Sequence, residues 1–510
     1  MVEELEPKFL SNHLMENQII INTTFNETRV ALGENGTITE IYVERQSHPR
    51  TVGNIYKGRV DKIVPGMQAA FIEMGLEKSG FISVEDVTED SFLDFFLGAE
   101  DEDSGENDWK QPIIQDILRE GQELLVQIIK EPTGAKGPKL SSNIALPGKY
   151  LVLLGTVDIV GISRRIYKDE ERQRLSEILS ASKPPGTGLI ARTASVGVGE
   201  GEILNELEYL KTLWEEIKSK SENQKAPSFL YREPKLCIRA VRDLLTQDVK
   251  TVVMDSKEVY DELQTYLKEN FNGVDVKLKL YEDPTPIFTH FGVDSELEKI
   301  AEKKVWLKSG GYLIIDIAEA LTVIDVNTGK YLKGKNQDDT IFDINLEAAQ
   351  EIARQIRLRN LVGIIVIDFI DMKDSSKRKE VYNTFTKALK RDKARSVVLE
   401  MSLFGVVQLT RQRIRENLLS TIAEPCEQCA GTGYVKSVET SIYEIIRALK
   451  SRLESMAGKK ITVAASKTIL QTLQSLEGEN LRRLEAESDV EILSEELRNP
   501  GNHLYEIRGE

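Results

Sequence analysis

The sequence predicts a multidomain protein that combines α/β and α+β folds, and three observations support this fold class. A length of 510 residues implies several domains, since a single core rarely serves more than about 300 residues. Short strand-like runs with glycine corners follow one another between residues 53 and 130, which is typical of a small closed barrel. Between residues 312 and 372, two apolar β-branched runs flank a helical pattern, which predicts a strand–helix–strand unit.

Composition excludes several classes of protein. With 40% hydrophobic and 29% charged residues, the chain has an ordinary globular composition, and no apolar run approaches the roughly 18 residues that span a bilayer. The acidic start lacks the features of a signal peptide, and three cysteines cannot build a disulfide framework, so we expect a cytoplasmic protein without a membrane span. The net charge of −16 argues against nucleic acid, but 11 of the acidic residues lie between Ser79 and Trp109, so global charge is a weak guide.

The N-terminal part predicts two small β structures. Asn35-Gly36 between alternating runs predicts a hairpin in an antiparallel sheet over residues 19–45. The barrel strands are expected at 54–60, 67–75, 80–83 and 123–130, with the acidic segment 85–108 as a solvated loop. The side chains of Lys57, Arg59, Phe71 and Phe81 fit the basic and aromatic face of an RNA-binding OB fold, or the two phenylalanines belong to the barrel core.

The middle of the chain predicts a mixed α/β region. Strands are expected at 150–154, 188–193 and 251–255, and helices at 169–180, 204–219, 241–246, 258–269 and 295–305. Arg192 and Thr193 stand at the end of a strand, before Gly197 and Gly199. An arginine beside a hydroxyl and a glycine-rich turn can hold a phosphate, although the same residues also make ordinary exposed turns.

Two strand-end aspartates are the candidate catalytic residues. Asp325 ends the run 321–325 and Asp368 ends the run 363–368, and the helix expected from Asn345 to Asn360, capped by both asparagines, can place the strands side by side. Two carboxylates are what Mg²⁺ usually takes from a protein, although aspartates also commonly start turns. Asn327 could orient a phosphate or a water molecule. On the helix, arginines 354, 357 and 359 read as solvent charges or as phosphate contacts.

A CxxC motif with following glycines lies at Cys426 and Cys429. This pattern predicts a zinc-binding turn, and because only two ligands are present, a second copy of the chain would complete the site. The alternative is a redox motif, but no strand–CxxC–helix context accompanies it. The four histidines, His13, His48, His290 and His503, all lie far from the aspartates in sequence, so histidine acid–base chemistry is not expected, and each reads as a surface or core residue.

Together these residues resemble the ribonuclease E/G family of endoribonucleases, most closely its ribonuclease G branch. The resemblance covers nearly the whole chain and rests on ordered motifs at 53–58, 66–71, 308–316, 325–329, 352–371 and the CxxCxGxG turn. The proline usual inside the CxxC of this family is absent, although Pro425 precedes it, and the acidic insertion is unusual.

The resemblance implies a domain order and a set of site residues. The implied domains are an RNase H-like scaffold (1–50 and 237–300), an OB-fold barrel (51–142), a 5′-sensor domain (143–236), a DNase I-like catalytic domain (301–422), a zinc-link (423–436) and a small C-terminal domain (437–510). The implied sites are Asp325, Asn327 and Asp368 for catalysis with Mg²⁺ on the aspartates; Phe71, Phe81 and Lys136 for RNA; Gly148, Val152, Arg192, Thr193 and Arg395 for a 5′-monophosphate; and Cys426 and Cys429 for a zinc ion shared between chains.

The function expected from the sequence is therefore an Mg²⁺-dependent endoribonuclease. It would cleave single-stranded RNA to 5′-phosphate and 3′-hydroxyl ends, respond to a 5′-monophosphate, act in rRNA and tRNA processing and mRNA decay, and form a homodimer or homotetramer. The alternative is a non-catalytic RNA-binding assembly protein built on the same barrel and zinc-binding turn.

Overall fold

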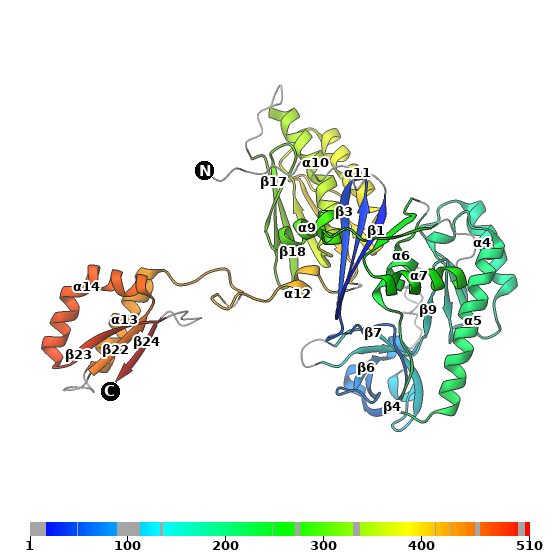
Figure 1. Cartoon of the computed structure of the whole chain (residues 1–510), viewed down its shortest axis with the longest axis horizontal. Coiled ribbons are helices and arrows are strands. Elements are labelled where there is room, and N and C mark those ends of the chain that lie inside the picture. Colours follow the sequence, from blue (N-terminus) through cyan, green and yellow to red (C-terminus); the bar gives the residue numbers. More distant parts are fainter. Residues whose placement is uncertain are drawn as a thin grey trace. The chain divides into compact units, whose positions relative to one another are not determined.

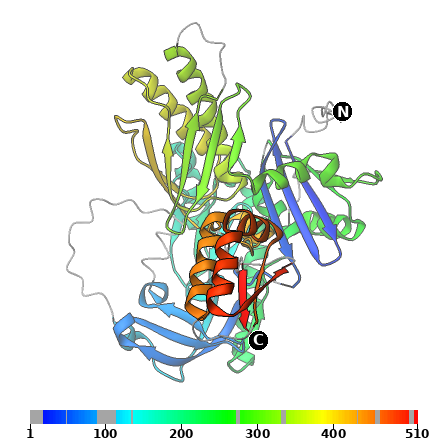
Figure 2. The same cartoon turned by 90° about the vertical axis from the view of Figure 1, so that its left-hand side faces the viewer.

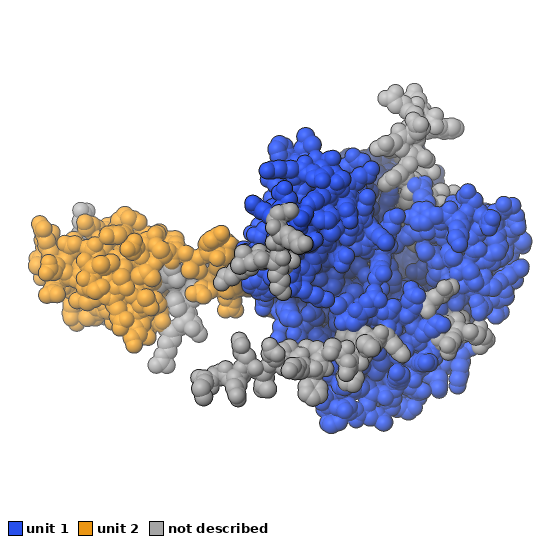
Figure 3. Space-filling view, turned by 90° about the horizontal axis from the view of Figure 1, so that it is seen from above, with its two compact units in different colours: residues 1–421 blue, residues 422–510 orange. Residues whose placement is uncertain are grey.

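The protein forms two compact units, residues 1–421 and residues 422–510 (Figure 3). The computed structural model describes residues 17–47, 49–88, 113–132, 136–246, 248–270, 276–329, 337–413, 415–429, 431–453, 460–497 and 505–509. Most of the acidic segment 85–108, together with His13, His48 and His503, lies outside the described residues. The described residues form five sheets with helices packed against them, which confirms the mixed α/β multidomain class.

The first sheet combines strands from two distant parts of the chain (Figure 1). Its order is β15 (Lys277–Leu280), β14 (Thr251–Met254), β1 (Gln18–Thr24), β2 (Glu27–Glu34) and β3 (Thr37–Arg45). The predicted hairpin is confirmed, because Asn35 and Gly36 have φ values of 50° and 78° and join β2 to β3. The prediction of a purely antiparallel sheet was wrong, because β14 pairs in parallel with β1. Alternation of apolar residues identifies a strand but not its partners.

Helices follow these strands and pack on the sheet. They are α6 (Leu236–Leu244), α7 (Lys257–Asn270), α8 (Ile287–His290) and α9 (Val293–Ile300). Leu236, Val241 and Leu244 of α6 join the core with Ile19 and Val252. The helix expected over 295–305 ends at residue 300, and its last residues instead form the strand β16 (Lys304–Trp306).

The predicted barrel is confirmed as a closed barrel. Its strands are β4 (Ile55–Val64), β5 (Ala69–Glu73), β6 (Gly80–Ser83), β8 (Lys139–Ser141) and β7 (Glu123–Lys130), hydrogen-bonded in that order, and β7 also pairs with β4. The short helices η1 (Pro65–Met67), α1 (Val84–Val87) and α3 (Ile114–Ile117) connect the strands. The strand β13 (Ser228–Tyr231) pairs with β4, which ties the barrel to a later segment of the chain.

A four-stranded sheet follows the barrel. Its order is β11 (Val160–Ile162), β12 (Gly188–Ala191), β10 (Leu151–Leu154) and β9 (Ala145–Pro147), with α4 (Asp169–Ser182), η2 (Thr193–Ser195) and α5 (Glu200–Asn223) beside it. The long helix α5 buries Ile203, Leu207 and Trp214 in the core that Leu151 and Leu189 also enter.

The aspartate sheet, as we call the six-stranded sheet that carries Asp325 and Asp368, has helices on one face (Figures 1 and 2). Its order is β16, β17 (Tyr312–Ile317), β18 (Leu321–Asn327), β19 (Gly363–Asp368), β21 (Val406–Arg411) and β20 (Ser396–Val398). The helices α10 (Gln337–Leu358) and α11 (Ser375–Leu389) bury Ile352 and Phe385 against Ile324 and Ile367. The opposite face, which we call the open face, exposes Val323 to 39%.

The predicted caps of α10 had different outcomes. The helix begins at Gln337, eight residues before Asn345, so Asn345 lies in its interior, is fully buried and is not an N-cap. The C-terminal cap is confirmed: Asn360 has a φ of 49°, its N–H bonds to the Arg357 carbonyl, and the Leu361 N–H bonds to the Ile356 carbonyl.

The three arginines at the C-terminal end of α10, where Arg359 directly follows the last helical residue, have neither of their expected roles. Arg354 bonds to Glu296 and to the Ile38 carbonyl, and Arg359 bonds to carbonyls in the segment 299–302. Arg357, with only 6% of its side chain exposed, pairs with Glu34 and Glu40. They anchor α10 to the first sheet and to α9, a role that helical periodicity alone cannot reveal.

The second unit contains a small α/β domain. Its sheet has the order β23 (Glu491–Glu496), β22 (Lys460–Ala465) and β24 (Tyr505–Gly509). The helices α13 (Val438–Leu453) and α14 (Lys467–Ser488) bury Ile445 and Leu473 in a core with Ile461 and Val463. The short helix α12 (Leu418–Ile422) precedes this domain. Across the described part of the chain, none of the helices combines the length and the apolar character that crossing a membrane requires.

Candidate active site and nucleic-acid interface

The carboxylate pair, Asp325 and Asp368, meets through strand register. β18 and β19 are parallel neighbours, and Asp325 lies directly opposite Asp368. Residues opposite one another on adjacent strands point to the same face. Both side chains are exposed on the open face, because the intervening residues Ile324 and Ile367 point into the core under the helices. The predicted pairing of the two strands is therefore confirmed.

The carboxylate pair is an unbalanced group of negative charges. Burial raises the pKa of Asp368 above its ordinary value, and the charges of Asp325 and Asp371 raise it further. No ion pair joins Asp325 or Asp368 to a basic side chain in the described part of the chain. The Asn327 side chain donates a hydrogen bond of 2.8 Å from Nδ2 to Asp325 Oδ2, so its amide lies at the carboxylate.

The donor set suits a hard divalent cation that keeps part of its own hydration. No group of three or more acidic, histidine or cysteine side chains that could hold a metal ion occurs among the described residues. Two carboxylates are what Mg²⁺ usually takes from a protein, leaving other positions to water and phosphate oxygens. Asp325 and Asp368 therefore fit Mg²⁺ better than they fit a cation that is coordinated entirely by protein.

Backbone and amide contacts hold the segment after Asp368. The Asn345 side chain donates to the Ile370 carbonyl at 2.8 Å and accepts from the Ile370 N–H at 3.1 Å. On the other side, the Phe369 N–H donates to the Gly405 carbonyl at 3.3 Å. Asn345 is thus a supporting residue of the site, and the sequence pattern assigned it to the wrong role.

The barrel presents a row of basic and aromatic residues. Lys62, Phe71, Phe81 and Lys139 lie opposite one another on β4, β5, β6 and β8. Phe71 and Phe81 are half-buried with ring centroids 6.0 Å apart, while their neighbours Ala70, Ile72 and Ile82 fill the core, so the barrel-core alternative was wrong. Lys136 is exposed two residues before Pro138, whose carbonyl accepts the N–H of Phe81.

The two basic residues that the sequence grouped with these phenylalanines face elsewhere. Lys57 donates to the carbonyls of Ser221 and Gln224, and Arg59 donates to that of Ala226. Both also pair with Glu123. They fasten the barrel to the end of α5. Lys62 and Lys139, which the sequence pattern did not single out, lie beside the rings instead, and Lys139 pairs with Asp86 at 2.8 Å.

Arg192, Gly148 and Asp243 form what we call the Arg192 cluster. The guanidinium of Arg192 donates to the Gly148 carbonyl and, at 2.9 Å, to Asp243. Burial would raise the pKa of Asp243, but the guanidinium groups of Arg242 and Arg192 hold it well below its ordinary value. Two of the expected phosphate-binding positions have different environments: Thr193 is exposed and lies 3.3 Å from the Ser163 hydroxyl, while the side chain of Val152 is buried and leaves only its backbone for a ligand.

Arg395 directly precedes β20 of the aspartate sheet, and the turn before it contacts the Arg192 cluster. Arg165, two residues after Ser163, donates to the carbonyls of Asp392, Lys393 and Ala394. Lys393 in turn reaches the Asp243 carbonyl. The turn before Arg395 is therefore fixed to the Arg192 cluster and to the loop that faces Thr193.

Comparison with known proteins decides the family. The profile described as "Ribonuclease E/G family" matches residues 145–414, more than half of the chain. The chain belongs to the ribonuclease E/G family. It is 39% identical over 471 residues to the protein named ribonuclease G in Escherichia coli K12, covering 92% of this chain and 95% of that protein.

Further relatives give the same picture of the family. Ribonuclease G of Haemophilus influenzae is 38% identical over 467 residues, covering 91% of this chain and 93% of that protein. Ribonuclease E of Escherichia coli K12 is 33% identical over 503 residues, which covers 97% of this chain but 46% of that longer protein. A second profile, described as "RNase E/G, Thioredoxin-like domain", matches residues 425–509.

The CxxC motif of this ribonuclease E/G family member lies in a turn between α12 and α13. Backbone N–H groups of Gly433 and Gly431 lower the pKa of the Cys429 thiol, as expected where amides fold over a sulfur atom, and Cys426 is a further hydrogen-bonding partner. Among the described residues, no strand leads directly into the motif, which disfavours the redox alternative. Cys237 is buried in the first unit's core and has its pKa raised by burial to about 11, so it is a packing residue.

Glu206 is a second buried residue that the sequence did not reveal. Its carboxylate accepts the backbone N–H groups of Lys149 (2.6 Å), Tyr150 (2.8 Å) and Leu151 (2.8 Å). A Cβ atom at Gly148 would lie 2.6 Å from the Glu206 Cδ atom, so only glycine fits there. Because Gly148 also supplies the carbonyl that holds Arg192, Glu206 determines the shape of the loop beneath the Arg192 cluster. An acidic residue on a long helix gives no sequence signal for this role.

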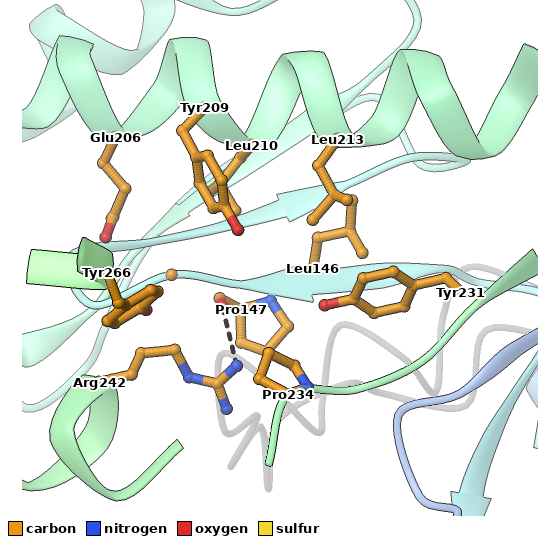
Figure 4. Close-up of a pocket in the computed structure, with 11 residues that line it drawn as sticks. Leu146, Pro147, Glu206, Tyr209, Leu210, Leu213, Tyr231, Pro234, Arg242 and Tyr266 are labelled. Atoms are coloured by element: carbon orange, nitrogen blue, oxygen red, sulfur yellow. Dashed lines mark hydrogen bonds between the residues drawn. The ribbon is translucent and has the colours of Figure 1, made fainter. Parts of the chain in front are cut away.

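A small pocket lies beside Glu206, between α5 and the segment of β9 (Figure 4). Its cavity of about 20 Å³ is lined by Leu146, Pro147, Gly148, Glu206, Tyr209, Leu210, Leu213, Tyr231, Pro234, Arg242 and Tyr266. Arg242 donates to the Pro147 carbonyl at 3.2 Å and pairs with Glu233 and Asp243. Since it has room for only about one water molecule, the pocket suits packing rather than a phosphate.

Proposed function

We propose that this chain is an Mg²⁺-dependent endoribonuclease that hydrolyses single-stranded RNA to 5′-phosphate and 3′-hydroxyl ends. The observation that carries the proposal is the carboxylate pair, in register on the open face of a ribonuclease E/G family protein. Asp325 and Asp368 would hold Mg²⁺, which when bound supplies positive charge at the scissile phosphate and at the attacking water.

The chain's own residues position the reacting groups. The Asn327 amide, fixed to Asp325, can orient a phosphate oxygen or a water molecule. The Asn345 contacts to Ile370 hold the end of β19 and so keep Asp368 in place. His290 is the one histidine in the described part of the chain. Its ring packs against Tyr281 and Phe291, so it is a packing residue rather than an acid or base for the carboxylate pair. Metal-assisted hydrolysis suits these residues better than histidine acid–base catalysis does.

Substitution of Asp325 tests this assignment. We expect Asp325→Asn to abolish cleavage of a single-stranded oligoribonucleotide while folding and RNA binding persist. Asp316→Asn is a matched control, because Asp316 is also exposed on the aspartate sheet but pairs with Lys303 at 3.1 Å. Full activity in Asp325→Asn would rule out the proposal.

The alternative is a non-catalytic RNA-binding assembly protein. The row of Lys62, Phe71, Phe81 and Lys139 would serve that protein equally well, because stacking rings and basic groups bind single strands without cutting them. Incubation of the purified protein with RNA in the presence and absence of Mg²⁺ separates the two functions, since only the enzyme yields magnesium-dependent products.

We also propose that the Arg192 cluster recognises a 5′-monophosphate, with Gly148, the Val152 backbone, Thr193 and Arg395 around the phosphate. The support is that Arg192 is held in place before any ligand binds, and that a guanidinium suits phosphate recognition. In Arg192→Ala we expect the preference for 5′-monophosphorylated over 5′-hydroxyl RNA to disappear. Arg483→Ala is the control, because Arg483 is exposed on α14 and pairs with Glu487 at 2.8 Å.

For the second unit we propose a zinc ion shared between two chains through Cys426 and Cys429. The support is the lowered pKa of Cys429 and the presence of only two thiols in the motif. About one zinc ion per two chains is expected from four-coordinate geometry, and Cys426→Ser should release both the zinc and the dimer. One zinc ion per chain, or an unchanged dimer, would contradict a shared site.

The remaining expectations follow from the family and stay part of the proposal. They are the RNase H-like, OB-fold, 5′-sensor and DNase I-like identities of the domains, assembly as a homodimer or homotetramer, a cytoplasmic location, and action in rRNA and tRNA processing and mRNA decay. The closed barrel and the three free cysteines support the OB fold and the reducing compartment, respectively.

A further inference from the structure

Two aromatic rings and a lysine lie together at the edge of the aspartate sheet. We call these residues, Lys304, Trp306 and Tyr312, the ring cluster. The Lys304 Nζ atom lies 3.9 Å from the centroid of the Trp306 ring and 3.8 Å from that of Tyr312. The two rings meet edge to face, with centroids 5.4 Å apart. Trp306 nevertheless exposes 63% of its surface, so this aromatic group is held in place but is not covered.

Strand register puts the ring cluster on the same face as the carboxylate pair. Trp306 lies opposite Tyr312, and Tyr312 lies opposite Asn327. In the adjacent row, Lys304 lies opposite Ile314, which lies opposite Asp325. Val305, between the two cluster residues of β16, packs instead on the core beneath the helices. Two strand spacings of about 4.8 Å therefore separate the backbone of Lys304 from that of Asp325.

The charge of the cluster favours a nucleic acid over a protein partner. Lys303 pairs with Asp316, whereas the ammonium of Lys304 forms no ion pair with a carboxylate among the described residues and rests between two rings. An exposed indole beside a basic group is the arrangement on which single-stranded bases stack. Protein interfaces also use tryptophan, but they are depleted in lysine.

We propose that Trp306, Tyr312 and Lys304 form a nucleotide-binding subsite beside the carboxylate pair. A base next to the scissile phosphate stacks on the Trp306 indole, and the Lys304 ammonium neutralises the phosphate of that nucleotide. Tyr312 holds the ammonium and the indole in place. This subsite rests on the proposed function, because it positions the same RNA strand that the carboxylate pair cleaves.

The test measures binding of a short single-stranded oligoribonucleotide to the full chain carrying Asp325→Asn, so that no cleavage intervenes. Adding Trp306→Ala should weaken binding about 10-fold, while Trp306→Phe should restore most of it, because a phenyl ring still stacks. Lys304→Ala should weaken binding and lower the salt dependence by about one phosphate contact. Lys303→Ala is the matched control and should bind as the parent does.

Tryptophan fluorescence reports the stacking directly. Of the three tryptophans, Trp214 is 8% exposed, and Trp109 is removed by working in a Trp109→Phe background. Bound RNA should quench the emission in this background, and Trp306→Phe should remove the quenching.

Unchanged affinity in Trp306→Ala would overturn the subsite. So would a Trp306→Ala protein that loses its oligomeric state while keeping its RNA affinity, because the surface would then be a protein interface. Either result leaves the proposed function intact, because that function is tested separately, by whether Asp325→Asn still cleaves RNA.

Discussion

The carboxylate pair and the Arg192 cluster bring their polar residues together in different ways. Asp325 and Asp368 meet because two parallel strands pair in register, and no basic side chain of the described chain pairs with them. Arg192 is instead held by Gly148 and Asp243, which lie 44 and 51 positions away, and its charge is already balanced. Asp325 and Asp368 have no basic partner among the described residues, which is what the proposed cation site would require. The Arg192 guanidinium is already fixed in position, which is what the proposed phosphate site would require.

The largest effect is expected when one member of the carboxylate pair is removed. In Asp368→Asn we expect kcat to fall at least about 10²-fold, the range found when one group that stabilises a transition state is lost. Thermal stability should not decrease, because the substitution removes repulsion from Asp325 and Asp371. Steady-state cleavage and thermal unfolding of the same preparation check both expectations. A stable protein with undiminished kcat would contradict the assignment.

A second test concerns the anchoring of α10, the helix behind the carboxylate pair. Burial alone would raise the pKa of Glu40, but Lys393 and Arg357 lower it to about 2. A carboxyl whose pKa is lowered in the folded state stabilises the protein above its unfolded pKa, and this contribution is lost as the pH falls. Stability should therefore decline between pH 4.5 and about 2.

Glu40→Gln isolates this contribution. Breaking one buried ion pair typically costs about 3–5 kcal/mol, so the variant should unfold at lower denaturant concentration near neutral pH. It should also lose that part of the acid dependence which belongs to Glu40. Denaturant unfolding at a series of pH values provides the measurement, and an unchanged pH profile would contradict the ion-pair account.

Asn345 links the helix to the carboxylate pair and gives a smaller effect. Asn345→Ala leaves the Ile370 N–H and carbonyl without their partners, so we expect a loss of about 1–3 kcal/mol in stability. Cleavage should fall with little change in KM, because Asp368 shifts while the RNA-binding surfaces remain. Gln350→Ala, at an exposed position of the same helix, is the control. Unchanged kcat in Asn345→Ala would mean that Asn345 supports only the fold.

The smallest expected effect concerns the loop beneath the Arg192 cluster. Glu206→Gln presents an NH₂ group to backbone N–H donors, so the loop 148–151 should shift and Arg192 should lose its carbonyl partner. We expect roughly a 10-fold loss of preference for 5′-monophosphorylated RNA, which corresponds to about one charged hydrogen bond. Glu208→Gln, exposed on the same helix, should change nothing. A Glu206→Gln enzyme with full preference would show that the loop does not depend on this carboxylate.

The carboxylate pair forms through strand register and the Arg192 cluster through long-range side-chain bonds, and this difference explains how much of each site the sequence could predict. Hydrophobic periodicity locates strands and helices, and strand order then brings Asp325 to Asp368, so this part of the site could be predicted. Side-chain bonds across many positions leave no periodic trace. For that reason Asn345 was taken for a cap, Lys57 and Arg59 for RNA contacts, and Arg357 for a surface charge, and Glu206 was not noticed at all.

We propose that the carboxylate pair directs a metal-dependent hydrolysis. The chemical groups at the ends of the RNA products show whether it does. A single-stranded oligoribonucleotide is incubated with the purified protein in Mg²⁺ or in excess chelator, and the products are weighed by mass spectrometry. We predict cleavage only with Mg²⁺, with a 5′-phosphate on the downstream fragment and a 3′-hydroxyl on the upstream one. Cleavage that persists in chelator and leaves 2′,3′-cyclic phosphates would contradict it, because the RNA's own 2′-hydroxyl would then be the nucleophile.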